Sequence, residues 1–273
     1  MLLLDPKGPI GEETRFVIVA AFALMLIVVI PVFILAVWFP LAYRASGRKA
    51  VYLPKWSKSV KIDLIIWLIP IVIVTLLGIL AWKKTHDLDP YKPIDSSVEP
   101  VRIEVVSLDW KWLFIYPDYD IAAIAELVFP VRVPLSFRLT SDTVMTSFFI
   151  PQLGSQIYAM GGMQTRLHLL ANEAGVYDGQ NQQFSGRGYS GMTFKAIAVP
   201  QDQFEAWVQR AKQAPGKLDS DRFAELEKPS ANSPVEYFSA VQPDLFDLVL
   251  GKFMSMDMDS GSMPMNPGVA EGQ

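Results

Sequence analysis

FVIVAAFALMLIVVIPVFILAVWFPLAY, residues Phe16–Tyr43, is a run of 28 residues without a charged side chain. A second uncharged run of 19 residues follows at Leu64–Trp82. At a rise of about 1.5 Å per residue, helices of these lengths reach about 42 and 28 Å, against a bilayer hydrocarbon core of about 30 Å. Both runs therefore predict transmembrane helices. A leader peptide before a soluble domain does not fit, because the first run is too long and a second one follows.

The segment between the two runs is basic, whereas the segments outside them carry mixed charge. Its six cationic residues are Arg44, Arg48, Lys49, Lys55, Lys58 and Lys61. The positive-inside rule places this loop, residues 44–63, in the cytoplasm and both chain termini outside. We therefore expect an outer N-terminal tail (1–15), a helical hairpin (16–89) in the inner (plasma) membrane of a bacterium, and a periplasmic remainder.

Composition excludes several other classes of protein. The formal net charge of −4 provides no basic surface for nucleic acid. The chain has no cysteine, which excludes a disulfide framework and a cysteine-based zinc site. Membrane lipid is the partner that the 51% hydrophobic content predicts.

Beyond residue 100 the pattern changes to that of β-strands. Val101–Val105 and Leu135–Leu139 alternate apolar and polar residues, and further short aromatic and branched runs follow between turn residues. These features predict a β-sandwich over 101–200, without deciding between cupredoxin and immunoglobulin-like topologies. For 201–253 we expect a helical, aromatic-rich segment. The first helix should bury one face, which consists of Phe204, Trp207, Val208 and Ala211. A second, short helix should follow at 221–227.

Six ordered strings along the chain resemble subunit II of the cytochrome bo-type ubiquinol oxidases, members of the haem–copper oxidase superfamily. They are Leu3–Gly8 (LLDPKG), Asp109–Pro117 (DWKWLFIYP), Ser147–Pro151 (SFFIP), Gly154–Met160 (GSQIYAM), Gly162–Leu167 (GMQTRL) and the aromatic-rich Glu236–Phe253. The resemblance implies a cupredoxin-like periplasmic domain in a complex that oxidises quinol, reduces oxygen to water and pumps protons. The strings leave ubiquinol and menaquinol oxidases open.

The resemblance also assigns cofactors and partners. Haems, the oxygen-reducing copper and the quinol site belong to subunit I in this family, so no cofactor is expected in this chain and ubiquinol binds the complex elsewhere. Subunit I is the main expected partner, followed by subunits III and IV. Family members carry a leader and a lipid-modified cysteine upstream of the Leu-Asp-Pro-Lys motif. Lipid anchoring here has therefore either been removed from the sequence by processing or is absent.

The stretch Phe184–Lys195 is similar to the Cys-x3-Cys-x3-His-x2-Met loop that holds a two-copper electron-transfer centre in related oxidase subunits. The upstream histidine of that centre corresponds to Thr146, and the loop ligands correspond to Phe184, Gly188, Met192 and Lys195. Such a centre needs bridging thiolates and imidazoles, which hold the cuprous state. A phenyl ring, a bare glycine and an ammonium do not replace them, so we predict no copper centre.

Asp63, at the cytoplasmic start of the second span, is the candidate for the entrance of a proton path. The family assigns a carboxylate at this place, usually Glu, to the entrance of its K-channel. A structural explanation is equally open, because an acid at a helix N-terminus is favoured by the helix dipole. Trp110 and Trp112 match the family's electron-transfer aromatic patch, but packing or contact with subunit I is the expected role without a metal behind them. His86 and His168 are isolated, and neither is assigned a role.

A methionine-dense tail, residues 254–273, is expected to be disordered. Thioethers suit Cu(I), so transient copper capture is the alternative for its methionines, Met254, Met256, Met258, Met263 and Met265. Two further hypotheses compete with that of a copper-free oxidase subunit. One is an active copper electron carrier, but this chain lacks the thiolates that such a carrier needs. The other is a membrane-tethered periplasmic copper-handling or sensory β-sandwich, which predicts no complex with a haem-bearing membrane protein.

Overall fold

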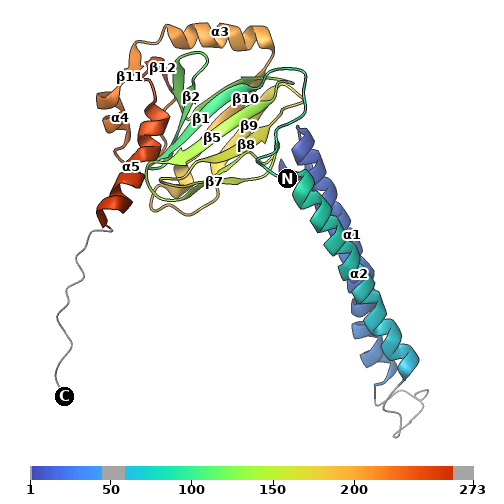
Figure 1. Cartoon of the computed structure of the whole chain (residues 1–273). Helices are drawn as coiled ribbons and strands as arrows, with labels where there is room; N and C mark the ends of the chain where they lie inside the picture. Colours follow the sequence, from blue (N-terminus) through green and yellow to red (C-terminus); the bar gives the residue numbers. More distant parts are fainter. Residues whose placement is uncertain (1, 45–58, 261–273) are drawn as a thin grey trace, which may run out of the picture. The chain divides into compact units, whose positions relative to one another are not determined.

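The computed structural model of the protein describes residues 2–44 and 59–260, and it divides into two units (Figure 1). One unit is the helical region 13–89. The other combines the beginning of the chain, up to Glu12, with everything from Pro90 onward. We describe each unit in turn.

The helical unit consists of two long apolar helices, α1 (Pro9–Ala42) and α2 (Val60–Asp87). Both are long and apolar enough to cross a membrane, and almost none of their most apolar stretches is buried within the chain. This exposure separates them from the core helices of a soluble protein. The Lys84 ammonium forms a 2.7 Å ion pair with Glu13 and lies 5.8 Å from the Phe16 ring centroid. The start of α1 therefore meets the end of α2, as in an antiparallel hairpin.

The other unit, residues 2–12 and 90–260, is called the outer unit here and is built around two sheets. The spatial order of the seven-stranded sheet is β11 (Gly216–Leu218), β12 (Glu236–Val241), β3 (Ile121–Ile124), β2 (Lys111–Tyr116), β1 (Val101–Leu108), β5 (Leu135–Ser141) and β8 (Thr165–Leu169). The spatial order of the five-stranded sheet is β4 (Glu126–Pro130), β10 (Thr193–Val199), β9 (Gly175–Asn181), β6 (Thr146–Phe149) and β7 (Ile157–Ala159). Parallel pairs join β1 to β5, β4 to β10 and β11 to β12. The predicted two-sheet sandwich is confirmed.

Aromatic side chains from both sheets fill the space between them. Phe148 and Phe194, from the five-stranded sheet, stack with centroids 5.1 Å apart. Trp112, Phe114 and Phe137, from the other sheet, pack against Phe148 at 5.4 to 6.3 Å. Such rings bury large apolar areas and favour edge-to-face contacts, so this cluster is a main source of sandwich stability.

The C-terminal segment, expected to be helical and aromatic-rich over 201–253, also contains strands. Besides α3 (Gln201–Lys212), α4 (Ser220–Leu226) and α5 (Leu245–Ser260), it contains β11 and β12, which extend the seven-stranded sheet. The predicted face of α3 is buried as expected. Side chains of this segment form a second core on the outer face of the sheet; they include Leu218, Phe223, Leu226, Phe238, Leu245, Phe246 and Val249. The six residues of β2 are therefore all buried, because the strand is covered on both faces.

Two expected boundaries also shift. The α1 helix begins at Pro9, so the second half of the expected N-terminal tail 1–15 is helical. The α5 helix continues to Ser260, so the first residues of the expected disordered tail 254–273 are helical. A short 3-10 helix (Leu2–Leu4) precedes α1, and another (Tyr189–Gly191) lies between β9 and β10.

The N-terminal LLDPKG motif is bound to the sandwich by main-chain hydrogen bonds. The Lys7 amide donates to the Gln152 carbonyl at 2.7 Å, and the Asn172 amide donates to the Lys7 carbonyl at 2.7 Å. A Cβ on Gly8 would lie 2.2 Å from the Leu170 carbonyl oxygen. This close approach of two backbones explains why a glycine stands in the motif.

Candidate functional site

The five positions that match copper ligands lie on β6, on β10 and on the loop between β9 and β10. Thr146 begins β6, and Lys195 lies in β10. Phe184, Gly188 and Met192 lie on the intervening loop, with Met192 directly after the 3-10 helix. The structure therefore places them around one end of the sandwich.

Two of these positions are buried and hydrogen-bonded. The Thr146 hydroxyl donates to the Ser107 hydroxyl at 2.7 Å, in a fully buried pair. Met192 is 1% exposed, and its sulfur accepts from Asn181 Nδ2 at 3.3 Å. Because each group is satisfied by a protein partner, neither is left as a free donor for a metal.

Asn181 is the centre of this network, and sequence reasoning did not identify it. Its Oδ1 accepts from the amides of Ser147 (2.8 Å) and Gln183 (2.9 Å). Its Nδ2 also donates to the Ser185 hydroxyl at 3.2 Å. A single buried amide thereby joins β6, β9 and the loop between β9 and β10.

The Trp110 indole fills the space next to Gly188. A Cβ on Gly188 would lie 2.2 to 2.5 Å from three atoms of the Trp110 ring. The ring is fixed by a 2.7 Å hydrogen bond from its Nε1 to the Ser185 carbonyl and by a positive φ of 63° at Trp110. A thiolate at position 188 therefore has no room, quite apart from its absence in the sequence.

The remaining two positions are at the surface. Phe184 is 73% exposed, with its ring centroid 5.8 Å from that of Tyr189. The Lys195 ammonium forms an exposed 2.5 Å ion pair with Asp178. The structure therefore does not bring all five positions together around one space.

Other candidate ligands do not converge either. Among residues 2–44 and 59–260, no group of three or more His, Cys, Asp or Glu side chains could hold a metal ion. His168 lies on β8, where burial and the nearby Arg166 lower its pKa. His86 belongs to the helical unit, where its Nδ1 lies 2.8 Å from the Trp82 carbonyl. The side chains of Met254, Met256 and Met258, and all of Met263 and Met265, lie outside the described part of the chain.

Asp63 is exposed in the first turn of α2, where its amide donates to the Ser59 carbonyl at 2.9 Å. This position suits both of its predicted roles. A carboxylate here favours the helix N-terminus, and it is also accessible to protons.

Lys111 is a buried anchor that sequence reasoning did not assign. Its ammonium donates to the carbonyls of Leu226 and Lys228, both at 2.8 Å, at the end of α4. Burial lowers its pKa, although Asp109 opposes the shift. The sequence signal that could have identified Lys111 is its position as a lone cation inside the otherwise apolar Trp110–Tyr116 run. Trp112 is fully buried in the aromatic core, as expected for a packing role.

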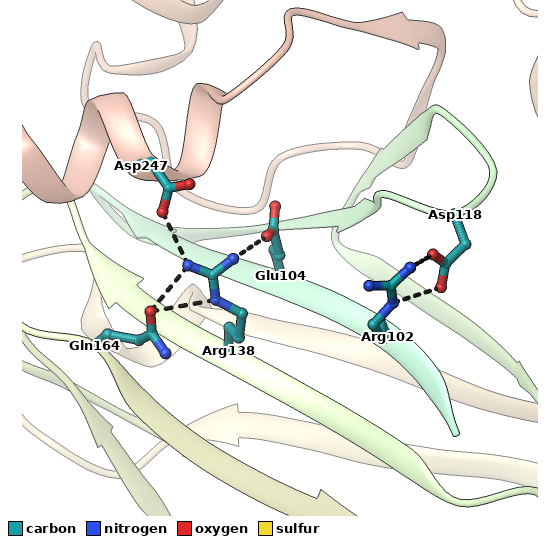
Figure 2. A network of polar contacts seen from close by, with 6 residues as sticks. All are labelled: Arg102, Glu104, Asp118, Arg138, Gln164 and Asp247. Carbon is teal, nitrogen blue, oxygen red and sulfur yellow. Dashed lines mark hydrogen bonds and ion pairs between the residues drawn. The ribbon is translucent and has the colours of Figure 1, made fainter. Parts of the chain in front are cut away.

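A polar network fixes α5 on the outer face of the seven-stranded sheet (Figure 2). The Arg138 guanidinium, on β5, donates to Glu104 on β1 at 2.8 Å and to Asp247 on α5 at 2.9 Å, and it also donates to Gln164. Arg102 forms a second ion pair, with Asp118. Burial raises the pKa of Glu104, and Arg138 opposes this shift. The network joins two guanidinium groups to three carboxylates and links β1 and β5 to α5.

Comparisons with known proteins show which family the chain belongs to. The family described as "Cytochrome C oxidase subunit II, periplasmic domain" matches residues 121–199, and that described as "COX Aromatic Rich Motif" matches residues 212–257. The chain is 53% identical over 255 residues to the cytochrome bo(3) ubiquinol oxidase subunit 2 of Pseudomonas putida, covering 93% of this chain and 81% of that protein. The corresponding subunit of Pseudomonas aeruginosa is 53% identical over 253 residues, covering 93% and 76%.

A third relative, the ubiquinol oxidase subunit 2 of Acetobacter aceti, is 48% identical over 266 residues, covering 96% of this chain and 86% of that protein. These matches favour the oxidase hypothesis over the copper-handling or sensory sandwich. The sandwich of the outer unit is like the cupredoxin-like domain of subunit II, and the two apolar helices fit an inner-membrane protein. The chain belongs to the family of subunit 2 of the cytochrome bo(3) ubiquinol oxidases.

Proposed function

We propose that this chain is the non-catalytic subunit II of a proton-pumping quinol oxidase, and that it stabilises the oxygen-reducing subunit I without carrying electrons. The observation that carries the proposal is the state of the copper-ligand positions. Two of them are satisfied by protein hydrogen bonds, one faces the Trp110 ring and two lie at the surface. Quinol releases its electrons within the membrane, so the complex needs no copper relay in the outer domain.

The rest of the complex supplies the redox chemistry in this proposal. Haems and the oxygen-reducing copper reside in subunit I, and ubiquinol binds the complex rather than this chain. Subunits III and IV complete the assembly. Both termini and the sandwich lie in the periplasm, in agreement with the basic loop between the two spans. For the methionine-dense tail, copper capture stays the alternative to a disordered terminus.

The test uses the intact complex, purified in mild detergent through an affinity tag on this chain. We expect haem absorption and quinol-driven oxygen consumption to copurify with the chain. We also expect no near-infrared band of a mixed-valence two-copper centre in the oxidised complex. A near-infrared band that disappears on reduction would contradict the proposed metal-free role, and a chain that purifies without haem would contradict its membership of the complex.

We also propose Asp63 as the entrance of a proton path. An exposed carboxylate at the boundary of the membrane can collect protons from the cytoplasm. Asp63→Ala should slow steady-state oxygen consumption several-fold and slow haem reduction, whereas Asp63→Glu should retain both rates. Glu12→Ala, which removes an acid from the first turn of α1, is the matched control and should change neither. Unchanged rates in Asp63→Ala would leave Asp63 only its role at the helix end.

A further inference from the structure

Two methionines face each other where the pairing of β6 and β7 ends. Met145 directly precedes β6, and Met160 directly follows β7. The antiparallel register pairs Thr146 with Ala159, so its continuation by one residue sets Met145 opposite Met160. Residues directly opposite each other in such a ladder share one face of the sheet, with Cβ atoms about 4.5–5.5 Å apart.

A third methionine, Met163, is held next to Met160 by a β-turn. The Met163 amide donates to the Met160 carbonyl at 3.3 Å across Gly161 and Gly162, and Gly162 has the positive φ of 72° that favours glycine. The Met160 carbonyl also accepts from the Ser141 amide at 3.3 Å, which fixes the turn to β5. Methionine side chains are unbranched and rotate freely, so three thioethers attached this close together can converge on one ion.

These thioethers are open to solvent. Met163 is 54% exposed and Met145 is 40% exposed. Met160 is partly exposed, and Tyr158, which shares its face of β7 by strand alternation, is 41% exposed. Methionine is among the residues that proteins most often bury, so core packing does not explain this group.

The donor chemistry of the group selects a soft metal ion. Thioether sulfur suits Cu(I) and binds hard or cupric ions poorly. A site made of thioethers alone therefore keeps copper in the cuprous state and does not transfer electrons. A cuprous ion has a filled d shell, so its binding here adds no near-infrared band and leaves the test of the proposed function unaffected.

The end of α5 lies against the same turn. A Cβ on Gly161 would lie 3.1 Å from the Phe253 ring, and one on Gly162 would lie 3.0 Å from the Phe253 Cβ. The methionine-dense tail therefore begins within contact distance of the turn that carries Met160 and Met163. In the sequence, Phe253 is followed by Met254, Met256, Met258, Met263 and Met265.

We propose that Met145, Met160 and Met163 form a surface site that binds one Cu(I) ion through their thioether sulfurs. The site is separate from the five positions that match copper ligands. Met145 precedes one of these positions, Thr146, but strand alternation directs Thr146 to the opposite face, where its hydroxyl bonds to Ser107. The inference is independent of the proposed oxidase role, because none of the three methionines takes part in it.

The experiment titrates the purified, intact complex with Cu(I) in the presence of ascorbate and the coloured chelator bicinchoninate. We expect the complex to remove one equivalent of Cu(I) from the chelator. Met145→Leu and Met163→Leu remove a sulfur at nearly constant volume, and each should weaken binding roughly tenfold or more. Met25→Leu, which removes an isolated thioether from α1, is the control and should bind as the unaltered complex does.

A second variant separates this site from the tail. Replacement of all five tail methionines by leucine should leave the one equivalent bound with similar affinity. The proposal is overturned if the intact complex takes no Cu(I), if Met163→Leu binds equally tightly, or if the tail variant alone loses binding. Equally tight binding of Cu(II) without ascorbate would also contradict a thioether site. Unchanged oxygen consumption in each variant verifies that the complex is intact.

Discussion

Gly188 and Trp110 form a packing pair in which the small residue makes room for the large one. The indole is fixed by its hydrogen bond to the Ser185 carbonyl and by its left-handed backbone, so it cannot easily move. Any side chain at position 188 must therefore displace the ring or the loop.

Gly188→Cys should destabilise the outer domain by about 1–3 kcal/mol, the usual cost of overpacking. Phe184→Cys is the matched control, since it introduces the same residue at an exposed position of the same loop. Thermal proteolysis of this chain within the purified complex, under reducing conditions, measures the melting temperature of both variants. Equal melting temperatures for the two variants would contradict the packing argument.

His168 should make the outer domain sensitive to acid. Its pKa lies below the ordinary value of 6.5, mainly because of burial, so protonation costs more in the folded than in the unfolded protein. Stability is therefore fully present above pH 6.5 and is lost as pH falls through the lowered pKa.

His168→Gln should remove this part of the pH dependence. We expect the melting temperature of the unaltered chain to fall, relative to that of His168→Gln, between pH 7.5 and pH values below about 6. Arg166→Gln should reduce the effect, since Arg166 contributes to the shift. A constant difference between the chain and His168→Gln across this range would show that the imidazole titrates as it does in water.

The C-terminal elements are attached to the sandwich by the ammonium groups of Lys111 and Lys252 as well as by apolar contacts. Lys111 on β2 binds carbonyls at the end of α4. Lys252 on α5 binds Asp142, whose side chain is 3% exposed, and also Glu227, both at 2.8 Å. Charges held in such surroundings are costly unless paired, so each anchor depends on its partners.

Lys111→Met should loosen α4 and β12, because it leaves two carbonyls of Leu226 and Lys228 without their donor. We expect a loss of about 1–3 kcal/mol and faster amide hydrogen exchange in residues 220–241. Lys217→Met, an exposed lysine on β11, is the control and should leave exchange unchanged. Exchange that is equally slow in Lys111→Met would mean that apolar packing alone holds the segment.

The chain as a whole offers a clean test of its orientation, because it contains no cysteine. Asp95→Cys, in the linker after α2, should react with a membrane-impermeant maleimide added to intact spheroplasts. Ser57→Cys, in the basic loop, should react only after the membrane is permeabilised. Labelling of Ser57→Cys in sealed spheroplasts would reverse the predicted topology.

Much of the architecture could be predicted from local patterns. The two helices follow from uncharged runs longer than a bilayer needs, a signal that depends on composition alone. The sandwich follows from alternation in β1 and β5, which have one exposed and one buried face over part of their length. The strands β11 and β12 were missed because β11 is short and both are defined by pairing with distant residues.

The sequence alone determined that this chain contains two helices apolar enough to cross a membrane and offers no thiolate to copper, because hydropathy and donor chemistry are properties of single residues. Only the tertiary structure decided what surrounds the positions that match copper ligands. It placed the Trp110 ring against Gly188, the Asn181 amide beside Met192, and the C-terminal segment over β2. These outcomes depend on which distant segments fill a shared volume, and no local pattern encodes that.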